Sequence, residues 1–237
     1  MDRKQRVLVV CPTGSPAPDD AGHWRNTKHR DVPYDIVLIK YREFQVGDGE
    51  LPVMQRSDAG NKWELVRRFL VEHVDLWSQY AHVGFVDDDL VFTPNDLTAA
   101  IEIALANDFQ LYQMSMSSNS ECSYSILFNR PELLYAKTNF VEIMAPFVST
   151  EKLPILVDFM GTYPVSTGWG IDLVLPRLLS CYAYVVHASS MYHPPRKDGS
   201  TYDKSAAVQE QRICLNRALE RNVTPAQIAQ IGIVTRA

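Results

Sequence analysis

Apolar runs alternate with polar stretches along the first half of the chain, and each run predicts one element. Short apolar runs bounded by Gly, Pro or Asp predict strands over Val7–Val10, Tyr34–Lys40 and Ala81–Val86. The apolar positions of Lys62–Asp75 recur at helical spacing, whereas Gln45–Asp58 is polar and predicts a loop. Thr93 precedes a proline suited to the first helical position, so we expect a helix from there to about Asn107. Alternating strands and helices favour an α/β fold with a mostly parallel sheet.

The second half of the chain predicts further elements on the same grounds. Strands are expected over Gln110–Met116, Tyr124–Phe128, Thr138–Ala145 and Tyr182–His187. Helices are expected over Glu151–Phe159, Ile171–Leu179 and Ser205–Arg221, with a short terminal helix from Thr224. No repeat, low-complexity tract or linker divides the sequence, so we expect a single domain over residues 1–237, with C-terminal helices from about residue 205.

Composition narrows the classes of partner and compartment. Of the residues, 46% are hydrophobic and 22% charged, and a formal net charge of −5 gives no global attraction to nucleic acid. The four cysteines are far apart and form no Cys-x-x-Cys pair, which argues against a zinc site and favours a reducing, cytoplasmic setting. No segment approaches the ~20 apolar residues of a transmembrane helix, while peripheral membrane association stays open.

Three consecutive carboxylates, Asp87, Asp88 and Asp89, follow the predicted strand that ends at Val86. Charges next to an apolar core need a partner or a cation, and carboxylate oxygens suit Mg²⁺ and Mn²⁺. Asp87 and Asp89 would share one face if the strand continued through them. The alternative is that the acids cap the following helix or are solvated in a loop.

A second candidate is the turn that begins at Thr167, in which two glycines flank Trp169 and Asp172 opens a helix. Glycine permits a tight turn close to a ligand, an indole face can stack on a sugar, and Asp172 could act as a general base. The alternative is that Asp172 only complements the helix dipole and Trp169 belongs to the core.

Basic and imidazole side chains supply the remaining candidates. Lys62 at a helix start and Arg196 in a late loop could contact phosphate. His193 and His187 follow a predicted strand, and a neutral imidazole can complete a metal shell begun by carboxylates. A core or surface role for these histidines is the alternative.

Several blocks of the sequence resemble, in the same order, those of the DUF707-type glycosyltransferase family. The resemblance spans roughly residues 61–196 and is carried by Gly60-Asn61-Lys62-Trp63-Glu64, Phe69-Leu70, Tyr80, Phe85-Val86-Asp87-Asp88-Asp89-Leu90, Val141–Pro146 and Thr167–Asp172. Family members often have a longer chain after this point, so the acceptor pocket here would be small or completed by a partner.

The resemblance implies a Rossmann-like GT-A fold, a three-layer α/β/α sandwich with a central, mostly parallel mixed sheet. It implies a glycosyltransferase of the hexosyl or a related class that moves sugar from a nucleoside-diphosphate donor to a carbohydrate or other hydroxyl acceptor. Mn²⁺ or Mg²⁺ would be held by Asp89, Asp87 and His193, with His187 as second choice for the histidine.

The resemblance implies that Asp87 faces the donor ribose or the metal. From the residues themselves, Asp88, Lys62, Thr13 and Arg196 are also expected to contact the donor nucleotide. Trp169 and Gly170 would lie on the acceptor side, and Asp172 would be the base if the enzyme inverts configuration; a retaining enzyme needs no such base.

Two other functions stay open from the residues. Asp87-Asp88-Asp89-Leu90-Val91 also fits the phosphatase motif of the haloacid dehalogenase type, with Asp87 as nucleophile and Asp89 as acid/base. That motif normally opens the first strand of its fold, and a later paired-acid motif is missing here. A non-catalytic sugar-nucleotide-binding protein is the third reading.

Overall fold

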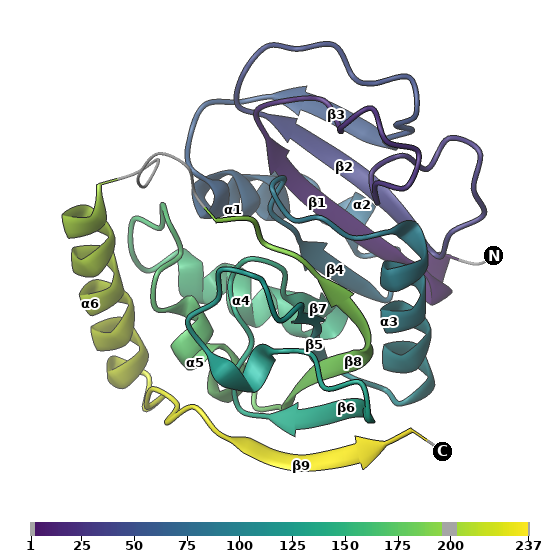
Figure 1. Cartoon of the computed structure of the whole chain (residues 1–237). Coiled ribbons are helices and arrows are strands. Elements are labelled where there is room, and N and C mark those ends of the chain that lie inside the picture. Colours follow the sequence, from purple (N-terminus) through teal and green to yellow (C-terminus); the bar gives the residue numbers. More distant parts are fainter. Residues whose placement is uncertain (1–2, 196–202, 237) are drawn as a thin grey trace.

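The computed structural model describes residues 3–195 and 203–236, which form one mixed sheet with helices on both faces (Figure 1). The strands are β1 (Val7–Thr13), β2 (Tyr34–Lys40), β3 (Met54–Ser57), β4 (His82–Phe85), β5 (Leu111–Met116), β6 (Leu133–Thr138), β7 (Phe147–Ser149), β8 (Ala183–Met191) and β9 (Gln230–Thr235). The α-helices are α1 (Lys62–Glu72), α2 (Val74–Trp77), α3 (Pro94–Ala106), α4 (Leu153–Met160), α5 (Ile171–Leu178) and α6 (Lys204–Glu220). Short 3₁₀ helices are η1 (Arg3–Gln5), η2 (Ser125–Leu127) and η3 (Thr150–Lys152).

The order of the described strands across the sheet is β3-β2-β1-β4-β7-β5-β8-β6-β9. Only β7 and β6 run against the direction of the other seven, which confirms a mostly parallel mixed sheet. The carboxyl ends of β1, β2, β4, β5 and β8 therefore meet at one edge of the sheet. In such sheets, ligands bind at this edge, next to the point where the strand order reverses.

Both faces of the sheet are covered, which gives the predicted three layers. Leu8 and Val10 of β1 pack toward α1, α4 and α5, whereas Val7 and Val9 face the cluster that contains α3. All seven residues of β1 are buried because layers of helices and loops cover both faces of this central strand. This explains why its sequence is a nearly continuous apolar run and not an alternating one. Helix α6 packs on the outside of α5, away from the sheet (Figure 1).

The helix predicted after Thr93 forms with the expected cap. The Thr93 hydroxyl accepts a hydrogen bond from the Asp96 backbone N–H (3.2 Å), and the Asp96 carboxylate accepts one from Thr93 N–H (2.9 Å). This reciprocal capping box fixes the start of α3 directly after the acid turn.

Three of the predicted elements are wrong, and four of the described strands, β3, β6, β7 and β9, were not predicted. Tyr124–Phe128 forms η2 instead of a strand, and residues 139–146 form a loop after β6 instead of the strand expected over Thr138–Ala145. β3 lies inside the segment predicted as a polar loop.

No helix starts at Thr224 because its carbonyl and that of Pro225 accept hydrogen bonds from Arg177. The Asn139 side chain binds the backbone of Gln227 and Ala229, which leads the chain in extended form into β9. Long-range contacts thus override the local cap signal. Within the described ranges, no helix has the length and apolar character needed to cross a membrane.

Candidate active site at the carboxyl edge of the sheet

The three acids lie in a turn just beyond β4, and each carboxylate has a different partner. Asp87 Oδ1 lies 2.7 Å from Lys62 Nζ. The same ammonium donates to the carbonyls of Ile143 (2.5 Å) and Met144 (2.9 Å), and Met144 O also accepts from Asp87 N–H (2.9 Å). Lys62 therefore joins the start of α1, the acid turn and the segment before β7.

The surroundings of Asp87 shift its protonation equilibrium in opposite directions. Burial raises the pKa of Asp87 to about 6, against the lowering effect of Lys62 and with a further increase from Asp89. The ion pair thus offsets only part of the desolvation cost, so Asp87 accepts a proton more readily than a solvated aspartate does.

Asp88 points away from this ion pair, toward the loop after β1. Its Oδ2 accepts a hydrogen bond from Gly14 N–H (2.9 Å), and the Tyr41 hydroxyl lies 3.4 Å from the same oxygen. Asp88 therefore ties the acid turn to the loops that follow β1 and β2.

Asp89 faces His193, with 3.4 Å between Asp89 Oδ2 and His193 Nε2. The His193 ring is buried, and its Nδ1 lies 3.0 Å from the Glu121 carbonyl. A carbonyl only accepts, so Nδ1 carries the proton that forms this bond and Nε2 is the atom turned toward Asp89. This is the hydrogen-bonding pattern that fixes the ring of a metal-binding histidine.

His187 lies apart from Asp89. It is fully buried, and its ring accepts from Arg130 N–H (3.2 Å). Burial and the nearby Arg130 lower the pKa of His187 to about 4. The structure therefore places His193, and not His187, beside an acid of the triplet.

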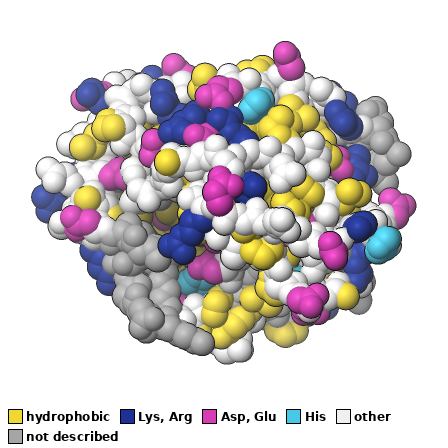
Figure 2. All heavy atoms as spheres, turned by 90° about the horizontal axis from the view of Figure 1, so that it is seen from above, with side chains coloured by type: hydrophobic (Ala, Val, Ile, Leu, Met, Phe, Trp, Pro, Cys, Tyr) yellow, Lys and Arg dark blue, Asp and Glu magenta, His cyan; other side chains and the backbone are white. Residues whose placement is uncertain are grey.

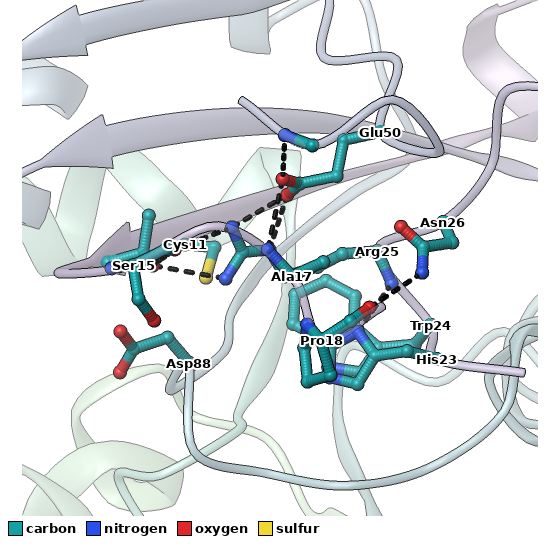
Figure 3. Close-up of polar contacts among 12 residues, drawn as sticks. Cys11, Ser15, Ala17, Pro18, His23, Trp24, Arg25, Asn26, Glu50 and Asp88 are labelled. Carbon is teal, nitrogen blue, oxygen red and sulfur yellow. Dashed lines mark hydrogen bonds and ion pairs between the residues drawn. The ribbon is translucent and has the colours of Figure 1, made fainter. Parts of the chain in front are cut away.

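The side chain of Thr13, the last residue of β1, forms hydrogen bonds within the loop that follows this strand. Its hydroxyl donates to Ser15 O (2.7 Å) and accepts from the Arg25 guanidinium (3.0 Å). Arg25 and Glu50 form an ion pair at 2.6 Å with both side chains only 1% exposed. Figure 3 shows the guanidinium between Glu50 and Ser15, with Asp88 next to that loop. This network fixes the shape of the loop beside the acid turn.

The turn of residues 166–170 has the backbone that its glycines suggest. Gly168 has φ +83° and Gly170 has φ +96°, which are left-handed values that favour glycine. A Cβ at Gly168 would come within 2.2 Å of the Trp63 ring. Trp169 is half-buried, and a cavity of about 490 Å³ lies between this turn and α6, lined in part by Asn61, Thr167 and Gln209.

Asp172 lies in the first turn of α5 and is 8% exposed. Its Oδ1 accepts a hydrogen bond from Leu173 N–H (2.9 Å), so it does complement the helix start. Burial nevertheless raises the pKa of Asp172 to about 6. The side chain is thus both a helix-start acid and a carboxylate that can exchange a proton near neutral pH.

Glu142 belongs to the same region and was missed by the sequence reasoning. It lies two residues before Met144, and its side chain accepts from the Cys122 thiol (3.5 Å). Burial, with Asp172 as the next cause, raises the pKa of Glu142 to about 7. The sequence feature that could have identified Glu142 is that it is the single acid within the apolar stretch Val141–Pro146.

Arg196 lies outside the described residues. Among those that are described, no group of three or more His, Cys, Asp or Glu side chains is arranged to hold a metal ion by itself. Seen from above (Figure 2), Lys and Arg side chains are interspersed with Asp and Glu on the visible face, without one broad basic surface.

Comparison with known proteins gives structural likeness without sequence relatives. No family model and no curated protein matches the chain. TarS from S. aureus, in a structure of residues 1–349 with UDP-GlcNAc, is similar with a TM-score of 0.50 and 12% identity, over 91% of this chain and 73% of that chain. A longer TarS structure is similar with a TM-score of 0.50 and 11% identity, over 90% of this chain and 43% of that chain. The likeness shows the fold: the chain has a GT-A-like α/β/α fold.

Proposed function

We propose that the chain is a metal-dependent glycosyltransferase that moves a sugar from a nucleoside-diphosphate donor to an acceptor hydroxyl. The observation that carries the proposal is the meeting of Asp89 and His193 in the turn after β4, at the ligand-binding edge of a GT-A-like sheet. Structural neighbours with this fold are glycosyltransferases, and one was solved with UDP-GlcNAc. The ordered blocks that resemble the DUF707-type family support the same assignment.

The donor atoms of this pair fit Mn²⁺ or Mg²⁺. A carboxylate oxygen and an imidazole nitrogen face each other, and the imidazole is oriented by the Glu121 carbonyl. Such cations commonly take one or two protein ligands and complete their shell with substrate phosphates and water, so a larger protein ligand set is not required. When bound, the cation would neutralise the departing diphosphate.

The neighbouring residues have distinct tasks in this proposal. Lys62 holds the carboxylate of Asp87, which leaves Asp89 and His193 as the metal-binding pair and Asp87 as a donor-side acceptor of hydrogen bonds. Asp88 orders the loop at Gly14 beside the nucleotide. The hydroxyl and amide groups of the cavity between residues 166–167 and α6 suit a hydroxyl-rich acceptor.

Asp172 is the proposed base for the acceptor hydroxyl. Its raised pKa makes it a better proton acceptor than a solvated aspartate, while most of it is still ionised near pH 7. The pKa of Glu142 is raised by burial and by the nearby charge of Asp172. Glu142 could therefore accept the proton of the acceptor hydroxyl in place of Asp172, or form a hydrogen bond with a sugar hydroxyl.

Thermal unfolding with UDP or GDP, with and without MnCl₂, tests the proposal. We expect nucleotide and Mn²⁺ together to raise the Tm by about 5 °C or more at saturation, and neither alone to do so. Asp89→Asn should abolish this increase, whereas Asp75→Asn, at an exposed position on α2 before β4, should leave it intact. A protein that shows no metal-dependent increase with either nucleotide is not this kind of transferase.

The phosphatase alternative has less support. Its motif opens the first strand of its own fold, whereas these acids follow β4, and Asp87 is ion-paired with Lys62. Steady hydrolysis of p-nitrophenyl phosphate that is lost in Asp87→Asn would favour it. The non-catalytic alternative would be favoured if nucleotide binds with metal but no hydrolysis of UDP-GlcNAc is ever detected.

A further inference from the structure

We propose that Glu210 on α6 is a positioning residue, whose carboxylate holds the turn of residues 166–168 so that Trp169 and Asp172 stand at the acceptor side of the site. The inference rests on the proposed function for its catalytic meaning. It assigns a role to the C-terminal helix, which neither the sequence motifs nor the structural likeness had suggested.

The contacts of Glu210 saturate its carboxylate. Oε1 accepts from Ser166 N–H (3.0 Å) and Gly168 N–H (2.8 Å). Oε2 accepts from Thr167 N–H (2.8 Å) and from the Thr167 hydroxyl (2.8 Å). Four donors from one turn thus converge on a side chain more than 40 residues away in sequence, in a residue that is 8% exposed.

This arrangement is an anion site that the chain fills with its own carboxylate. Three successive backbone N–H groups form a concave nest of the kind that binds anions. A buried carboxylate without donors would be costly, and here the donors of the turn offset that cost. The carboxylate and the turn therefore stabilise each other, because separating them breaks all four hydrogen bonds at once.

Glu210 interrupts an otherwise apolar stripe on α6. The other buried residues of this helix are Ala207, Cys214 and Ala218. Cys214 packs against Gly170, since a Cβ at Gly170 would lie 3.2 Å from the Cys214 Cβ. The buried face of α6 is thus directed at both ends of the turn.

The opposite side of the turn is held by the start of α1. The Asn61 amide donates to Ser166 Oγ (2.7 Å), and Trp63 N–H donates to Ser166 O (3.1 Å). The turn is therefore fixed between α1, whose Lys62 binds Asp87, and α6, which supplies Glu210. It then enters α5 through the hydrogen bond from Ile171 N–H to Gly168 O (3.0 Å), one residue before Asp172.

Glu210→Gln tests the proposal without changing the size of the side chain. One end of the amide is a donor, so it faces two donors of the turn and loses their hydrogen bonds. We expect amide exchange of residues 163–171 to increase at least 10-fold, with exchange in β1 and β4 unchanged. The affinity for UDP with MnCl₂ should stay within about 2-fold, while kcat for UDP-GlcNAc hydrolysis falls about 10-fold at constant KM.

Matched variants separate positioning from general stability. Glu220→Gln removes an exposed carboxylate from the same helix and should change none of these readouts. Thr167→Ser keeps the hydroxyl donor and should leave the amide exchange of residues 163–171 unchanged, whereas Thr167→Val should increase it. Adding Thr167→Val to Glu210→Gln should have less than the additive effect, because both act on one contact.

The exchange measurement requires no substrate and therefore stands apart from the proposed function. Unchanged exchange in residues 163–171 of Glu210→Gln would overturn the positioning role, even in an active enzyme. Equal loss of UDP affinity and of turnover would overturn it too, because the effect would then be global. A wild-type protein that binds no nucleotide would instead remove the transferase function and leave the turn measurement valid.

Discussion

At the level of single residues, the site is a set of carboxylates whose environments differ. Asp88 is held by a backbone N–H, Asp87 by an ammonium and Asp89 by a histidine. Asp172 and Glu142 are buried in the same region, and their pKa values are raised to about 6 and about 7. Carboxylates with fixed polar partners are suited to binding, whereas buried carboxylates with raised pKa values are suited to proton exchange.

Asp172→Asn should change the pH dependence of stability. A carboxylate whose pKa is raised on folding binds more protons in the native state, so its contribution is favourable below the unfolded-state pKa and is lost as pH rises through about 6. The variant should thus be more stable than the wild type by roughly 1–3 kcal/mol at pH 7.5 and about equal at pH 4. Urea unfolding at both pH values measures this.

The exposed Asp19 provides the comparison for that measurement. Asp19→Asn should leave the free energy of unfolding nearly unchanged at both pH values. An Asp172→Asn variant that is less stable at pH 7.5 would mean that the charged carboxylate gains more from the hydrogen bond donated by Leu173 N–H than its burial costs.

At the level of elements, one glycine turn connects three helices. Gly168 combines a left-handed backbone with close contact to the Trp63 ring, so two independent constraints exclude a side chain there. Helices α1, α5 and α6 meet at this turn through Asn61, Ile171 and Glu210.

Gly168→Ala should therefore be strongly destabilising. The added Cβ both strains the backbone and collides with a buried indole, and we expect a loss of roughly 2–4 kcal/mol in the free energy of unfolding. Chemical denaturation followed by circular dichroism is the measurement. Gly232→Ala, where the nearest atom would lie 3.9 Å away and φ is not in the left-handed range, should cost less than about 1 kcal/mol.

The elements that sequence reasoning predicted well are those set by local chemistry. The buried strand at Tyr34–Lys40 and the capped helix after Thr93 need only an apolar run or a capping residue. Elements set by distant partners were missed: β9 exists because it pairs with β6, and the helix expected at Thr224 is replaced by contacts to Arg177.

In the candidate site too, features set by local sequence could be predicted, whereas features set by distant contacts could not. The acid triplet, Lys62 and the glycine turn are visible as patterns, and the structure brings Lys62 to Asp87 and His193 to Asp89. Glu142 and Glu210 carry no motif, because their importance comes from chain segments that are far apart in sequence. A lone acid within an apolar pattern was their only sequence signal.

At the level of the whole molecule, the two apolar clusters are the two faces of one sheet. Strand β1 contributes alternate residues to each cluster, so neither can lose its packing without exposing the other. The order of the strands also separates the molecule into a parallel half around β1 and a mixed half around β7 and β6 that remain joined by β4.

The chain should consequently unfold in one cooperative transition. Tryptophan fluorescence reports mainly on the parallel half and its helices, and far-ultraviolet circular dichroism reports on all elements. We expect the two urea curves to coincide. Separate midpoints would show two units and contradict the single domain that the sequence predicts.

The three consecutive residues Asn61, Lys62 and Trp63 have a thermodynamic consequence. Lys62 binds the acid turn, while Asn61 and Trp63 bind Ser166 on the other side of the site. A ligand that strengthens or weakens the contact between Lys62 and Asp87 would therefore also change the contacts of Asn61 and Trp63 with Ser166, because all three residues belong to the start of one helix. Occupancy on the two sides would then be coupled, and by linkage each ligand would change the affinity of the other by the same factor.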